Sequence, residues 1–116
     1  MMHQGSCHCG RVAFEVEGEP TQLIECNCSH CDRKGYLLWF VTADKFHLLQ
    51  GEGELTNYQF NKHEIDHKFC STCGCAPFAT GKVPVTGVEM VAVNVRCMPE
   101  LDRAGLDVKQ VDGRSL

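Results

Sequence analysis

The stretch Cys70-Ser-Thr-Cys73-Gly74 holds two cysteines separated by two residues and followed by a glycine. Two thiolates on such a turn point at one ion and the glycine relieves the backbone behind them, which is typical of a zinc knuckle. A knuckle supplies half of a tetrahedral site. We expect its partner to be Cys7-His-Cys9-Gly10, which offers two thiolates ahead of a predicted strand. A CxxC redox pair would open a helix in an α/β fold, and the sequence predicts none there.

A third cluster, Cys26-Asn-Cys28-Ser-His-Cys31, places three cysteines within six residues. Such a loop can wrap one ion and leave its fourth position free, as expected for a zinc ion that meets a substrate. A fourth protein ligand from His30, Cys75 or Cys97 would instead close the site and make it structural. Apart from that alternative, we interpret Cys75 and Cys97 as small apolar core residues and His30 as a side chain outside the ligand set.

Seven of the nine cysteines therefore divide into a set of four and a set of three. This division predicts two Zn²⁺ ions per chain, one in a closed site and one in an open site. Arg33 and Lys34 follow the three-cysteine cluster directly. They would offset the negative charge of three thiolates and attract an anionic substrate, unless they only form a solvated turn.

Short apolar patterns of strand length run through the whole chain, and the sequence predicts little helix. The expected strands are residues 11–17, 21–25, 37–41, 46–49, 55–60, 65–70, 75–80, 89–98 and 105–116, the last at a sheet edge. Val12, Phe14 and Val16 share one face of the first, and the continuous apolar run 37–41 is expected to be buried on both faces. Without repeats or linkers, residues 1–116 are expected to form a single, mostly β domain pinned by metal.

Composition limits the partners and the compartment. An odd count of nine cysteines argues against a fully paired disulfide framework, and the N-terminus lacks the features of a signal peptide. No apolar run approaches the length of a membrane span, so we expect a cytoplasmic protein with reduced thiols. The net charge of −4 would reach about −7 with two zinc ions on seven thiolates, which argues against nucleic-acid and membrane partners.

The segment His63-Glu-Ile-Asp-His67 matches the H-E-x-x-H signature of zinc proteases. That mechanism needs a helix that stacks both histidines one turn apart, and this segment lies among strand patterns just before Cys70. We interpret it as a surface hairpin with two solvated histidines.

Several stretches together resemble the glutathione-dependent formaldehyde-activating enzyme family, which includes the domain of centromere protein V. The stretches are Gly5-Ser-Cys-His-Cys-Gly-Arg-Val-Ala-Phe-Glu-Val16, Glu25-Cys-Asn-Cys-Ser-His-Cys-Asp-Arg-Lys-Gly35, Phe69-Cys-Ser-Thr-Cys-Gly74 and Val93-Asn-Val-Arg-Cys97. The similarity extends to residues 51–58 and to the closing Asp112-Gly-Arg114. Cys75 departs from the small hydroxyl residue usual at its position, which puts an extra thiol near a zinc site.

The resemblance implies a β-tent of short antiparallel sheets scaffolded by zinc. It implies a structural zinc on Cys7, Cys9, Cys70 and Cys73, and a catalytic zinc on Cys26, Cys28 and Cys31. The implied activity is that of a carbon–sulfur lyase, which condenses glutathione with formaldehyde to S-hydroxymethylglutathione. The partners would then be a small-molecule thiol such as glutathione and an aldehyde. The competing interpretation is a non-catalytic binding module in which both metal sites are structural.

Overall fold

Ten short strands form two sheets in the described part of the chain, residues 2–60, 65–83 and 85–115 of a computed structural model. The small sheet has the order β1-β2-β5, and the large sheet has the order β10-β3-β4-β9-β8-β7-β6. The strands are β1 (Met2–Ser6), β2 (Ala13–Glu17), β3 (Gln22–Cys26), β4 (Leu38–Thr42), β5 (Phe46–Gln50), β6 (Leu55–Tyr58), β7 (Asp66–Cys70), β8 (Phe78–Lys82), β9 (Glu89–Asn94) and β10 (Asp107–Val111). The helices are α1 (Ser29–Lys34) and the 3₁₀ turns η1 (Ala43–Lys45), η2 (Glu52–Glu54), η3 (Val95–Cys97) and η4 (Gly113–Ser115).

The mostly β fold agrees with the prediction, and each expected strand overlaps an observed one. The alternation in the first expected strand is confirmed, because Val12, Phe14 and Val16 are all fully buried. The long expected strand 89–98 is shorter than predicted. It ends at Asn94, whose side chain accepts a hydrogen bond from Arg96 N and caps the turn η3.

Three features differ from the sequence prediction. β1 was not expected, and it pairs antiparallel with β2 along its whole length. β10 lies at the predicted edge but runs parallel to β3, whereas only antiparallel sheets were expected. The run 37–41 is not buried on both faces, since the Phe40 side chain is 46% exposed. The face of β4 that carries Phe40 borders a cavity described below.

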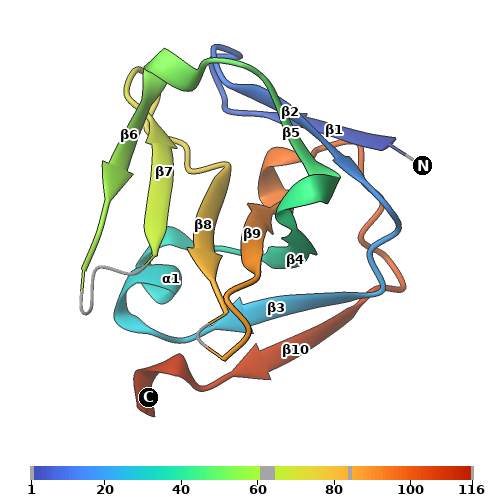
Figure 1. Ribbon diagram of the computed structural model, residues 1–116. Coiled ribbons are helices and arrows are strands. Elements are labelled where there is room, and N and C mark those ends of the chain that lie inside the picture. The colour runs from blue at the N-terminus through green and yellow to red at the C-terminus, as the bar shows by residue number, and fades with distance from the viewer. Residues whose placement is uncertain (1, 61–64, 84, 116) are drawn as a thin grey trace.

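The main core lies between the two sheets, where Phe14 and Val16 of β2 pack with Trp39 of β4 and Val93 of β9. Figure 1 shows the small sheet at the upper right and α1 at the lower left, with β6 to β9 running between these ends. The loop after β1 and the turn after β7 therefore lie far from α1 in this view. No described helix is long or apolar enough to cross a membrane.

Candidate metal centres and adjoining cavities

Cys7, Cys9, Cys70 and Cys73 form a four-thiol cluster whose sulfur atoms all lie within 4.8 Å of one another. Cys9 Sγ lies 3.6 Å from both Cys7 Sγ and Cys70 Sγ. Four sulfurs placed about 2.3 Å from a central zinc ion lie about 3.8 Å apart. The cluster therefore fits a tetrahedral zinc ion with four thiolate ligands.

Local backbone geometry presents these sulfurs. Gly10 and Gly74 follow the two cysteine pairs with φ of 82° and 81°, a conformation that favours glycine. Gly74 N donates to Cys70 O at 2.8 Å, which closes the turn after β7. Backbone N–H groups of Cys75 and Cys9 lower the pKa of Cys73 to about 5, so the turn already favours the thiolate that a metal needs.

The remaining two cysteines lie near this first cluster. Cys75 packs against Cys7, Val12 and Cys70, and its carbonyl accepts from Cys70 N at 2.9 Å. Burial and the neighbouring Cys75 raise the pKa of Cys97 to about 12. Neither thiol joins the three-cysteine cluster, so the suggested closure of that site by Cys75 or Cys97 has no support.

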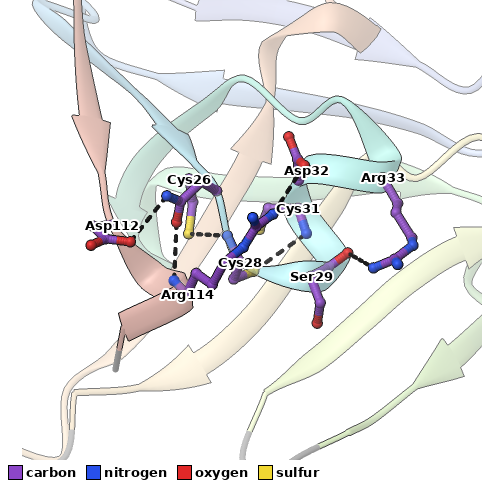
Figure 2. Close-up of polar contacts among 9 residues, drawn as sticks. Cys26, Cys28, Ser29, Cys31, Asp32, Arg33, Asp112 and Arg114 are labelled. Atoms are coloured by element: carbon purple, nitrogen blue, oxygen red, sulfur yellow. Dashed lines mark hydrogen bonds and ion pairs between the residues drawn. The ribbon is translucent and has the colours of Figure 1, made fainter.

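Cys26, Cys28 and Cys31 form a second cluster, also with sulfur atoms within 4.8 Å of one another. Cys26 ends β3, Cys28 is the N-cap of α1, and Cys31 lies in the first turn of that helix. Cys28 N donates to Cys26 Sγ at 3.4 Å, and Cys31 N donates to Cys28 Sγ at 3.3 Å, as Figure 2 shows. Among the described residues, no fourth histidine, cysteine or carboxylate joins the group, so it fits a metal with an open position.

The short helix α1 exists because its ends are capped. The Cys28 sulfur caps its first turn, and Gly35 ends it in the left-handed conformation with its N–H bonded to Cys31 O. Burial opposes ionisation of Cys28, but backbone N–H groups of Cys31 and His30 outweigh it and lower the pKa. Burial raises the pKa of Cys31. The pKa values of the two thiols are thus shifted in opposite directions, that of Cys28 downward and that of Cys31 upward.

The C-terminal segment packs against this cluster. Asn27 Nδ2 donates to Asp112 Oδ1 at 3.0 Å, and Arg114 N donates to Asn27 Oδ1 at 3.0 Å. Arg114 Nη2 also pairs with Asp32 Oδ2 of α1 at 3.3 Å, across an exposed surface (Figure 2). Between these contacts Gly113 lies so close that a Cβ added there would meet Cys26 Sγ at 2.5 Å.

Gly113→Ala is expected to loosen the three-thiol cluster. The added methyl group would also meet Cys28 Cβ at 3.2 Å, so the segment must move away, at a cost on the order of 1 to 3 kcal/mol. We expect a lower Tm and faster transfer of metal from this cluster to a chromophoric chelator. Gly53→Ala is the control, because a Cβ there meets nothing within 4 Å. Equal metal release from both variants would contradict the close approach.

One cavity adjoins the three-thiol cluster, and a second is lined in part by residues of α1. The first has a volume of about 500 Å³ and is lined by Cys26, Cys28 and Cys31 together with mostly apolar side chains. The second has a volume of about 470 Å³ and is lined by aromatic rings and by Arg33 and Lys34. The four thiols of the first cluster line neither cavity, within the described part of the chain.

Arg33 and Lys34 are both exposed, which agrees with the alternative of a solvated turn. Both also line the second cavity, where they could meet an anionic substrate. Arg33 Nη1 donates to Ser29 O at 2.9 Å, and Lys34 Nζ lies 5.3 Å from the centre of the Phe69 ring. These two side chains of α1 thus give the second cavity a cationic lining that is open to solvent.

His67 lines both cavities and was not expected there. The prediction of a solvated His67 is wrong: it lies on β7, is 8% exposed, and has its ring centre 4.3 Å from that of His30. Burial, and then His30, lower its pKa to about 4, so its imidazole is neutral at pH 7. The Nδ1 atoms of His30 and His67 have no hydrogen-bond partner among the described residues. His63 and Glu64 lie outside the described residues.

A sequence model of the family described as glutathione-dependent formaldehyde-activating enzyme matches residues 2–109. The chain belongs to this family. The resemblance based on the cysteine motifs is therefore confirmed, and the match covers all seven clustered cysteines while ending before residues 112–114. The crystal structure of a Rhodobacter sphaeroides protein is also similar, with a TM-score of 0.77 and 28% sequence identity, covering 91% of this chain and 99% of that chain.

Proposed function

We propose that this protein is a zinc-dependent enzyme of the carbon–sulfur lyase type that adds a thiol to an aldehyde. In the reaction for which the family is named, the thiol is glutathione, the aldehyde is formaldehyde, and the product is S-hydroxymethylglutathione. One observation carries the proposal: the three-thiol cluster lines a cavity, and no fourth ligand joins it among the described residues. Membership of the family supports the same chemistry at a coarser level.

The proposal assigns one zinc ion to each cluster. Cys7, Cys9, Cys70 and Cys73 would hold the structural ion, and Cys26, Cys28 and Cys31 would hold the catalytic one. A zinc ion with three thiolate ligands lowers the pKa of a thiol that joins it and so supplies a thiolate at neutral pH. Thiol ligands must stay reduced, and we accordingly place the protein in a reducing compartment such as the cytoplasm.

The chain's own residues would bind and orient the reactants. The capped turn of α1 fixes Cys28 and Cys31 relative to Cys26, and the segment around Gly113 covers Cys26. Arg33 and Lys34, which line the second cavity, would attract the carboxylates of glutathione. In the addition, the thiol sulfur bonds to the carbonyl carbon, the C=O π bond breaks, and the thiol proton ends on the carbonyl oxygen.

His67 is the side chain best placed to assist that proton. It is neutral at pH 7, and it lines both cavities. It could therefore hydrogen-bond to the carbonyl oxygen or to the new hydroxyl group. His30, the candidate considered from sequence, packs beside His67 and lines only the second cavity.

A thiol titration separates this proposal from a non-catalytic module with two structural sites. We expect two zinc ions per chain by elemental analysis. In protein reconstituted with Co²⁺, glutathione is expected to change the absorption of one ion, while the four-thiolate ion stays unchanged as an internal reference. We also expect the protein to speed exchange between formaldehyde and its glutathione adduct, measured by exchange NMR. Two ions with no spectral response and no faster exchange would leave the structural module as the better description.

A further inference from the structure

The apolar cavity beside the three-thiol cluster has a floor built by one row of cross-strand neighbours. Strand registers place His67, Ala79, Ala92 and Phe40 side by side across β7, β8, β9 and β4, and all four line this cavity. Directly opposed residues on neighbouring strands share a face of the sheet. The middle of the row carries only two methyl groups, from Ala79 and Ala92, while the ends carry large rings. The row therefore leaves a hollow over the centre of the sheet.

The walls of this hollow are apolar and lead to the cysteines. Ile24 of β3, Leu38 of β4 and Val111 of β10 line the cavity together with Cys26, Cys28 and Cys31. The volume of about 500 Å³ lies within the roughly 300 to 1,000 Å³ of small-molecule sites. The three-thiol cluster and the apolar hollow thus form parts of one cavity.

Charge is almost absent from the lining. Apart from the three cysteines, Lys82 is the one ionic side chain among the described residues that line this cavity, and it is exposed, with Nζ 4.0 Å from Glu89 Oε1. A carboxylate placed over Ala79 and Ala92 would lose its hydration without gaining a cationic side chain. The cationic side chains of α1, Arg33 and Lys34, line the other cavity. The two ends of a glutathione molecule therefore fit the second cavity better than the hollow.

Formaldehyde carries only hydrogen atoms on its carbonyl carbon, so it has no alkyl or aryl group for the hollow to bind. We propose, on the basis of the function proposed above, that the aldehyde substrate carries a branched alkyl or aromatic group, and that the hollow over Ala79 and Ala92 binds it. The addition is the same as before: one C–S bond forms, the C=O π bond breaks, and the thiol proton ends on the oxygen. Burial of the apolar group would favour the larger aldehyde by about tenfold or more over one that lacks it.

An aldehyde series tests this inference with the zinc-loaded protein and glutathione. Exchange NMR would give the catalysed rate, relative to the uncatalysed rate, for formaldehyde, acetaldehyde, 3-methylbutanal and benzaldehyde. We expect the two bulky aldehydes to exceed acetaldehyde by about tenfold or more in kcat/KM. Catalysis of formaldehyde addition with no gain for bulky aldehydes would overturn this inference and leave the proposed function intact. No acceleration with any aldehyde would overturn both.

A variant that fills the hollow provides a second test of the same inference. Ala92→Phe places a ring in the hollow and is expected to remove the preference for bulky aldehydes, so that their kcat/KM falls to that of acetaldehyde or below it. Ala104→Phe is the matched control, because Ala104 is exposed and lines neither cavity. Binding of benzyl alcohol, followed by methyl NMR shifts, is expected to be saturable in the wild type and lost in Ala92→Phe. If benzyl alcohol shifts no methyl group of Leu38 or Val111 in the wild type, or shifts them equally in Ala92→Phe, the hollow is not the binding site. Should Ala92→Phe fail to fold, Ala92→Leu takes its place.

Discussion

Replacing Cys70 by serine is expected to leave the protein unfolded and without metal at its four-thiol cluster. Cys70 is fully buried at the end of β7, and its sulfur lies 3.6 Å from that of Cys9, which is 61 residues away in the chain. The cluster thus joins the loop after β1 to the turn after β7. Apparent binding free energies for structural zinc are about 10 to 16 kcal/mol, whereas whole domains are stable by about 5 to 15 kcal/mol. Losing one thiolate therefore removes a share of stability that the small core cannot replace.

Circular dichroism and zinc content would check this expectation on protein expressed with added zinc. Cys75→Ser is the matched control, because Cys75 packs beside the cluster but is not one of its four thiols. We expect that variant to fold and to keep both metal ions. A Cys70→Ser protein with wild-type circular dichroism and an unchanged Tm would contradict the structural role of the cluster.

Sequence patterns predicted the strands with apolar alternation but missed elements that depend on their neighbours. β1 has no alternating apolar residues, and pairing with β2 makes it a strand. Its Gly5 lies against the Cys97 carbonyl and Met98, where an added Cβ would meet them at 2.7 and 2.8 Å. α1 is too short to show helical periodicity, and its caps at Cys28 and Gly35 define it. The parallel pairing of β10 depends on which sheet edge is free, and no local pattern contains that information.

The cysteine spacing predicted both thiol groups that the structure brings together, because ligands close in sequence constrain one another locally. The surroundings of the three-thiol cluster could not be predicted in this way. The hollow over Ala79 and Ala92 depends on the registers of β8 and β9, and His67 joins it only through pairing with Ala79. Residues 67, 79 and 92 are far apart in the sequence, and no pattern there predicts that they line one cavity. The H-E-x-x-H match drew attention to His67, but for a helix-based mechanism that its place on β7 does not allow.

Replacing Cys28 by serine is expected to abolish thiol addition while leaving the fold intact. Cys28 is half-buried, caps only the short helix α1, and belongs to the cluster that lines the apolar cavity. Serine keeps an N-cap oxygen, so the change at the helix cap itself should cost no more than about 1 kcal/mol. Changes in groups that only support a metal ligand cost about 10- to 100-fold in affinity or activity, and loss of a ligand itself should exceed 100-fold. Exchange NMR with glutathione and formaldehyde, zinc content and Tm would be measured together.

The comparison of Cys28→Ser with Cys70→Ser decides between an enzyme and a structural module, since the two changes are chemically identical. If the protein is an enzyme with one open site, the two variants should behave differently. Cys28→Ser should keep one zinc ion and its fold but lose activity, whereas Cys70→Ser should lose its fold. A module with two structural sites predicts that both variants lose stability to a similar degree. Cys97→Ser, which changes a thiol outside both clusters, should keep two zinc ions and full activity. If the Cys28→Ser protein retained catalysis, the reaction would not take place at the three-thiol cluster.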